Sequence, residues 1–245
     1  MRGQRLSPFG LAVAVLVLLV VAFVVRGSLL QTEHIVLPPE EDASAPGASQ
    51  GDESVRLDRV EVTPETVQAV IAALARPENY SRTVTVERCW DGGNAVATAQ
   101  VQVLLGRSRC DLSEGGETCH TVTNGRETAV WYDEETAVYR AASVLSADAE
   151  QGIPTYEDVL ALPVERIAAA DYRLLDSLSC IYVETAADEA GYAERWYISV
   201  DSGLLAAAEK LCGEEVVYRM KSLDVTLSAV TEAAFTLPDG TQLGE

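Results

Sequence analysis

The sequence predicts a mainly β (α+β) domain, built on a strongly curved antiparallel sheet or unclosed β-barrel with a few helices on its concave face. Three observations predict it. Apolar and polar residues alternate with a period of two over most of the chain after Tyr80. Turn residues separate these stretches at hairpin spacing, and Asn124-Gly125 is the strongest such signal. Only a few short segments carry helical spacing, so consecutive antiparallel hairpins are the expected architecture.

The N-terminus adds a predicted transmembrane helix to this fold. Residues 1–5 read as a cytoplasmic stub, and residues 6–26 as an uncleaved signal-anchor of Leu, Val, Ala and Phe that ends at Arg26. At about 1.5 Å per residue, this stretch spans a hydrocarbon core of roughly 30 Å. A cleaved signal peptide is the alternative, but the exit Val24-Val25-Arg26-Gly27 has no small-x-small pair. Arg2 and Arg5 favour an N-terminus on the cytoplasmic side of the cell membrane and a C-terminal domain on the outer side.

Residues 27–57 are expected to form an acidic, disordered linker, and residues 58–245 the extracytoplasmic domain. The linker is rich in Pro, Ser, Ala, Gly and acidic residues, which bury too little apolar surface to order themselves. All 38 acidic residues but only 15 basic ones follow Arg26, a net charge of −23 for that part. Nucleic acid and anionic head groups are therefore poor partners.

One amphipathic helix is expected at the start of the domain. Thr63 is a suitable N-cap, Pro64 suits the first helical position, and Pro77 stops the helix. The apolar stripe consists of Val67, Val70, Ile71 and Leu74. A helix with one such stripe packs on a partner, which we expect to be the sheet.

The strands fall into two groups separated by short helices. The first group starts at Tyr80 and continues with Val96–Leu105, Thr118–Thr123, Glu127–Tyr132 and Ala137–Arg140. Residues 155–162 and 164–169 are expected to be helical, with a break at Pro163. The second group is a four-stranded meander of Tyr172–Thr185, Tyr192–Val200, Leu204–Cys212 and Glu215–Leu227.

The five cysteines fit an extracytoplasmic location without proving it, and their odd number leaves at least one thiol outside any internal pair. Cys110 and Cys119 flank a loop-like segment. If this segment is a hairpin, the two residues face each other and can form a disulfide.

No catalytic or metal-binding pattern is present, so the sequence predicts a protein that is not an enzyme and has no cofactor. The two histidines are His34, in the linker, and His120, in a predicted strand. No Ser-His-Asp arrangement can be assembled, and no metal-ligand spacing appears. Among the abundant carboxylates, Asp133-Glu134-Glu135 and Glu214-Glu215 fall in predicted turns, where we expect them to be solvated.

Two aromatic pairs, Trp131-Tyr132 and Trp196-Tyr197, fall in predicted strands. Because adjacent strand residues point to opposite faces, one ring of each pair faces the interior of the curved sheet. Such rings either pack in the core or line an apolar cavity. The candidate cavity-lining residues are Val67, Ile71, Leu74, Trp131 and Trp196.

The C-terminal half resembles the LolA/RseB-like superfamily of outer-membrane lipoprotein carriers. The resemblance rests on the stretch from Tyr192 to Leu205, which contains the hairpin motif Asp201-Ser202-Gly203-Leu204. It also rests on the C-terminal motif Phe235-Thr236-Leu237-Pro238. It covers roughly residues 60–240. The Asp-to-Gly spacing is one residue shorter than the family pattern, and this Asp-Ser-Gly-Leu motif is short.

The resemblance implies an open barrel whose concave side holds the acyl chains of lipoproteins. It also implies alternatives, because regulatory relatives bind another protein and similar spore-germination lipoproteins partner a cell-wall amidase. This chain departs from those lipoproteins in lacking a lipobox cysteine, and from shuttle carriers in its predicted anchor. We therefore expect a fixed envelope protein that binds a lipid, an acyl chain or a lipoprotein, or else a regulatory or scaffold protein for a partner such as an amidase or anti-sigma factor.

Overall fold

The computed structural model describes residues 61–133 and 137–243. The predicted anchor at 6–26 and the whole of the predicted linker at 27–57 lie outside these residues. None of the helices in the described part of the chain combines the length and the apolar character needed to cross a membrane.

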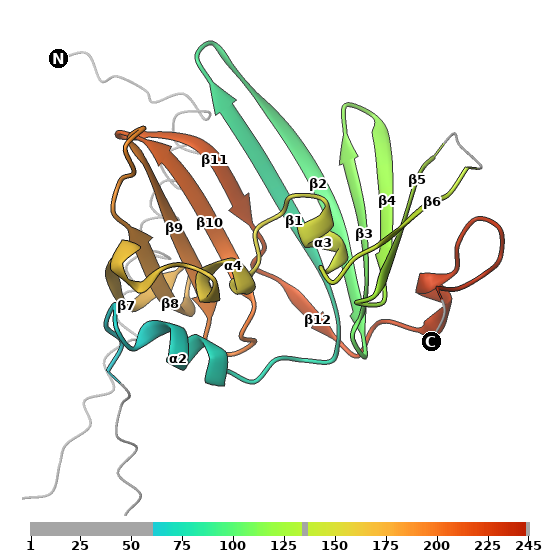
Figure 1. The fold of residues 1–245 in the computed structure, drawn as a ribbon, viewed down its shortest axis with the longest axis horizontal. Helices are drawn as coiled ribbons and strands as arrows, with labels where there is room; N and C mark the ends of the chain where they lie inside the picture. Colours follow the sequence, from blue (N-terminus) through green and yellow to red (C-terminus); the bar gives the residue numbers. More distant parts are fainter. Residues whose placement is uncertain (1–60, 134–136, 244–245) are drawn as a thin grey trace, which may run out of the picture. The chain divides into compact units, whose positions relative to one another are not determined.

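The domain is built on one twelve-stranded antiparallel sheet (Figure 1). Its first six strands are β1 (Asn79–Trp90), β2 (Gly93–Leu104), β3 (Arg107–Glu114), β4 (Glu117–Thr123), β5 (Glu127–Tyr132) and β6 (Tyr139–Ala142). The others are β7 (Ile167–Leu175), β8 (Leu178–Thr185), β9 (Tyr192–Ser199), β10 (Leu205–Cys212), β11 (Glu215–Lys221) and β12 (Val225–Leu227). The helical segments are α2 (Val67–Ala73), α3 (Ala147–Glu150), α4 (Tyr156–Leu160) and the 3-10 turns η1 (Val164–Arg166) and η2 (Glu232–Phe235).

The sheet consists of two meanders, β1–β6 and β7–β11, which are joined by pairing between the first strand of one and the last strand of the other. The strand order runs β6-β5-β4-β3-β2-β1-β11-β10-β9-β8-β7, with β12 paired to β1. The junction is the β1–β11 pair, whose register places Val86 opposite Met220. Since β6 and β7 end up at opposite edges, the sheet stays open, and the predicted unclosed antiparallel sheet is confirmed.

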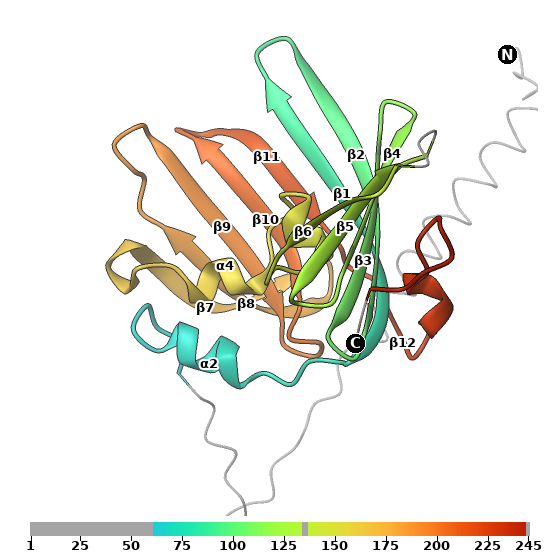
Figure 2. The same ribbon diagram turned by 45° about the vertical axis from the view of Figure 1, so that its right-hand side comes forward.

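The concave face carries the main hydrophobic core. One buried row crosses six strands and consists of Ala97, Val86, Met220, Ala208, Trp196 and Val183. Val67 and Ile71 of α2 and Val159 of α4 pack on this face and are fully buried. Figures 1 and 2 show α3 and α4 in front of the concave face and α2 near one end of it. The predicted helical cover and the Val67–Leu74 stripe are thereby confirmed.

The opposite face of β4 and β5 carries a second core. Val122, Ala129 and Trp131 point to this side, where the chain after β12 covers them. Phe235 of η2 is 1% exposed at the centre of this cluster. The C-terminal segment therefore packs on this face of the sheet and covers its apolar side chains.

Four predicted elements need correction. Residues 172–185 form two strands, because Asp176 and Ser177 adopt positive φ angles of 46° and 73° and make a tight hairpin turn without glycine. Strand β3 was not predicted. The helix expected at 164–169 is only the turn η1, after which β7 begins, and the last predicted strand breaks after Lys221.

The expected facing of Cys110 and Cys119 is also corrected. The hairpin exists, but its register places Cys110 opposite Thr121 and Cys119 opposite Leu112. The two residues are diagonal neighbours, and both thiols are free in the structure. Burial raises the pKa of the Cys110 thiol well above its ordinary value, which keeps the group protonated.

We predict that Phe235→Ala lowers the free energy of unfolding by about 3–5 kcal/mol, because it leaves a cavity in the second core. Tyr139→Ala removes an exposed ring from β6 and should cost less than about 0.5 kcal/mol. Urea unfolding of both variants, followed by circular dichroism, measures the difference. Equal, small effects would show that the C-terminal segment does not stabilise the sheet.

Candidate functional site

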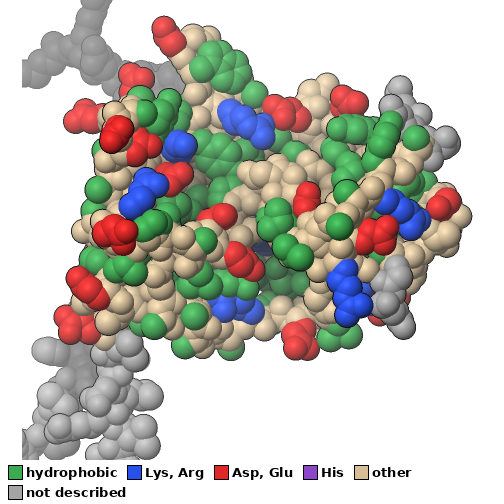
Figure 3. Space-filling view, viewed as in Figure 1, with side chains coloured by type: hydrophobic (Ala, Val, Ile, Leu, Met, Phe, Trp, Pro, Cys, Tyr) green, Lys and Arg blue, Asp and Glu red, His purple; other side chains and the backbone are tan. Residues whose placement is uncertain are grey.

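The connection from β6 to β7 creates the candidate site. Because these strands are opposite edges of the sheet, residues 143–166 must cross it, and they cross the concave face with α3 and α4. Over β7–β11, α2 and α4 fill the space with core side chains. Between this packing and α3, a cavity of about 320 Å³ remains over β1–β3. Figure 3 shows the concave face hollowed near its centre, with apolar side chains at the opening.

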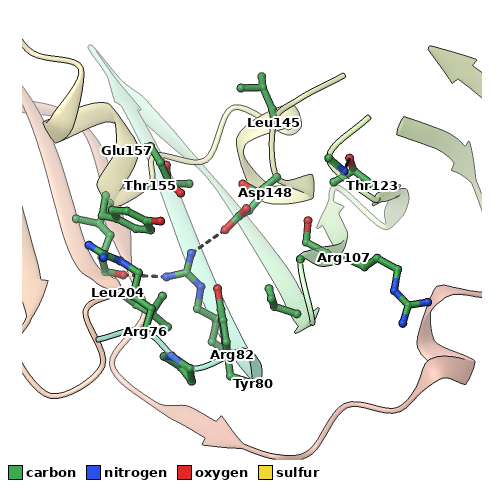
Figure 4. A pocket seen from close by; sticks show the side chains of 18 of the residues that line it. Arg76, Tyr80, Arg82, Arg107, Thr123, Leu145, Asp148, Thr155, Glu157 and Leu204 are labelled. Atoms are coloured by element: carbon green, nitrogen blue, oxygen red, sulfur yellow. Dashed lines mark hydrogen bonds and ion pairs between the residues drawn. The ribbon is translucent and has the colours of Figure 1, made fainter. Parts of the chain in front are cut away.

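An ion pair lies in the wall of this cavity. Arg82 of β1 donates from Nη2 to Oδ2 of Asp148 in α3 at 2.7 Å, and both side chains are about 5% exposed or less. The Nη1 group donates to the Leu205 carbonyl at 2.9 Å. Figure 4 shows the guanidinium between these two partners. A buried pair of this kind is costly to break, because either charge left alone is unsolvated.

Other polar contacts hold the crossing segment on the sheet. The backbone N–H of Ala147 donates to Oγ of Ser108 in β3 at 2.8 Å. At α4, the Gln68 amide donates to the carbonyls of Val159 and Leu162 at 2.9 and 2.8 Å. These contacts satisfy helix ends that would otherwise be unpaired. The cavity is therefore bounded by the sheet on one side and on the other by a segment that is held through both apolar packing and these polar contacts.

Arg76 closes the end of α2 beside the cavity. Its guanidinium donates to the carbonyls of Ile71, Leu74 and Gly203 and lies 3.6 Å from the centroid of the Tyr156 ring. Gly203 has a φ of +67°, and a Cβ there would lie 2.7 Å from the Ala75 carbonyl oxygen. Only glycine permits this approach, which explains the Asp-Ser-Gly turn in physical terms.

The remaining lining is mixed. Val103, Val144, Leu145 and Leu204 supply apolar surface, and Tyr80, Thr155 and Glu157 supply polar groups. Burial raises the pKa of Tyr80 to about 12 and is the main cause of a similar rise at Tyr156, so both phenols stay neutral. Arg107 also borders the cavity, but it pairs with Glu232, and in Figure 4 its side chain points away from Arg82.

The five predicted cavity residues do not line this cavity. Val67, Ile71 and Trp196 are buried in the main core, and Leu74 packs against it. Trp196 borders a separate hollow of about 220 Å³ beside Tyr218 and Lys210.

Trp131 lies on the other face of the sheet. It is paired with His120 in register and packs in the second core, whereas Tyr132 faces the concave side. Strand period alone does not say which of two adjacent rings points inward.

Arg82 and Asp148 were missed, although the sequence carried one signal. In β1 the inward positions are Tyr80, Arg82, Val84 and Val86, so an arginine occupies the apolar phase of the alternation. A cation on a core-facing position is expected only with a buried partner. Asp148 could not be found in this way, because α3 is a single turn without periodicity.

A larger hollow, of about 510 Å³, lies between the α2–β1 connection and β12. Leu178, Ser199 and Leu223 are among its lining residues. By strand alternation, Leu178 and Ser199 face away from the concave core, and Leu227 at its edge is 61% exposed. It is a surface depression, and the central cavity, which lies between the sheet and the crossing segment, is also open to solvent on one side.

We predict that Arg82→Met or Asp148→Leu alone lowers the free energy of unfolding by about 3–5 kcal/mol, because each leaves one buried charge unpaired. The double variant should recover most of this loss, since no charge remains. Arg88→Met breaks an exposed pair with Glu114 and should cost about 1 kcal/mol or less. Urea titrations give the four values, and additive effects in the double variant would contradict a coupled pair.

Comparisons with known proteins give similarity at the level of structure only. No family model matches the chain, and no curated protein matches it significantly. Similar solved structures include the complex of MucA and MucB from Pseudomonas aeruginosa, at 17% identity and a TM-score of 0.37 over 63% of this chain and 54% of that chain. The match therefore spans about half of that chain.

Two further structures are similar. A LolA superfamily protein from Nitrosomonas europaea matches at 10% identity and a TM-score of 0.35, over 71% of this chain and 97% of that chain. A putative outer membrane lipoprotein-sorting protein domain from Vibrio parahaemolyticus matches at 8% identity and a TM-score of 0.30, over 70% and 94%. These matches are likenesses of structure and say nothing of ligand or partner.

Proposed function

We propose that this protein is a non-enzymatic binding protein of the cell envelope, tethered by residues 6–26, whose concave cavity takes the acyl end of a lipid or lipoprotein. The observation that carries the proposal is the cavity of about 320 Å³, open on one side, between the sheet and residues 143–157. This volume is at the lower end of the roughly 300–1,000 Å³ typical of ligand pockets. It suits part of a ligand, with the rest outside the mouth at Val144 and Leu145.

The chemistry of the described residues supports binding over catalysis. The two ring nitrogens of His120 lie 2.7 Å from the carboxylates of Asp111 and Asp133, so neither is free to serve as a base. The ring also stacks on Trp131 at a centroid distance of 5.1 Å. In the cavity, the two carboxylates are Asp148, which is paired with Arg82, and Glu157.

We predict that Val103→Trp fills the cavity and lowers the lipid bound per chain about tenfold, equivalent to about 1.4 kcal/mol. Val96→Trp is the matched control, because it makes the same change on the outward face of the same strand. Full-length variants in amphipathic polymer are incubated with bacterial lipid vesicles, and bound lipid is measured by native mass spectrometry. Equal lipid on both variants, with unchanged circular dichroism, would reject the cavity as the site.

A protein partner is the second candidate function, and edge strand β6 favours it. All four of its residues are exposed, and within residues 61–133 and 137–243 it pairs with β5 alone. Tyr139 is 61% exposed, and Val144 just after the strand is 85% exposed. An open edge beside exposed apolar residues is the surface to which an extended segment of another protein adds a strand.

We expect Tyr139→Asp to reduce recovery of one stoichiometric partner from cross-linked membranes at least about fivefold, as a loss of about 1 kcal/mol implies. Leu174→Asp, at an exposed position of the other edge strand, should leave recovery unchanged. If no stoichiometric partner is recovered with the unmodified chain, the partner function is rejected.

A further inference from the structure

One donor in the cavity wall has no acceptor. The Nε–H of Arg82 is buried without a hydrogen-bond partner, although the side chain as a whole is 5% exposed and lines the cavity. A buried N–H that lacks an acceptor is destabilising, because nothing compensates the loss of its hydrogen bonds to water. A polar group kept in this state at the wall of a cavity points to a ligand atom that satisfies it.

The geometry of the guanidinium defines where the missing acceptor belongs. Nε–H and Nη2–H lie on one edge of the planar group, and a carboxylate often binds both. Here Asp148 uses Oδ2 on Nη2, whereas its Oδ1 accepts from the backbone N–H of Ala149 at 3.2 Å. One half of the edge, the Nε–H, is therefore unpaired, beside a carboxylate.

The charges around this half-edge favour a neutral acceptor. Asp148 already neutralises Arg82, and Glu157 is a second carboxylate of the lining. Arg76 is engaged by three backbone carbonyls and Arg107 by Glu232. An anionic head group would meet Asp148 without an uncommitted cation to balance it.

We propose that Arg82 is a specificity residue that recognises the neutral carbonyl oxygen of an acyl ester. This inference rests on the proposed function and specifies it. The carbonyl accepts from Nε–H beside Asp148, and the acyl chain lies along Val103 and Leu204. The ligand class is then an acylglycerol-type ester, as opposed to a free fatty acid or a plain hydrocarbon.

The test compares two probes that differ in the carbonyl alone. The full-length chain in amphipathic polymer is titrated calorimetrically with 1-monooctanoylglycerol and with its ether analogue 1-O-octylglycerol, both below their critical micelle concentrations. The ester should bind about tenfold more tightly, as expected for one hydrogen bond to a charged group. Octanoate should bind more weakly than the ester.

Arg82→Lys keeps the charge beside Asp148 but removes the second donor of the edge. It should reduce the ester affinity to that of the ether, while the ether affinity stays unchanged. Arg88→Lys, at an exposed position of the same strand, should keep the tenfold preference.

Each contrary result has its own meaning. Equal affinities for ester and ether in the unmodified chain would overturn the role of Arg82 but leave the binding function intact. Tighter binding of octanoate than of the ester would overturn the neutral acceptor. If neither glycerol probe binds, the proposed acyl-binding function itself fails.

Discussion

The pairing of β1 with β11 is the constraint on which the rest of the structure depends. It joins two meanders by their first and last strands, so that β6 and β7 become opposite edges of one sheet. The chain between them must then cross the whole sheet. It crosses the concave face, and the site exists because this crossing segment covers that face incompletely.

The two faces of the sheet are stabilised in different ways. The outer face of β4 and β5 is covered by the C-terminal segment through apolar contacts around Phe235. On the concave side, α2 and α4 complete an apolar core to which Ala147 of α3 also belongs. The Arg82–Asp148 pair and the hydrogen bond from the Ala147 N–H to the Ser108 hydroxyl add polar contacts at α3. Such buried polar contacts give little net stability, yet they fix geometry.

The sequence predicted the fold class well, because the signals that carry it are local. Asn124-Gly125 defines a hairpin, and Val67 to Leu74 define a helix face. Where the sequence reasoning failed, the deciding information was tertiary or unusual. Asp176-Ser177 makes a turn with positive φ angles in non-glycine residues, which sequence rules do not expect. Trp131 was assigned to the wrong face, because alternation gives two phases and only packing selects one. The sequence shows Arg82 as a cation at a strand position where the alternation expects an apolar residue, but its partner lies 66 residues away in a one-turn helix.

Hydrogen–deuterium exchange of the full-length chain, with and without saturating 1-monooctanoylglycerol, tests most directly whether the concave cavity is the binding site. The account predicts slower exchange for backbone amides in residues 101–108 and 143–157, which face each other across the cavity, and no change in 223–227. Protection of 223–227 at the surface depression, with residues 143–157 unchanged, would contradict it.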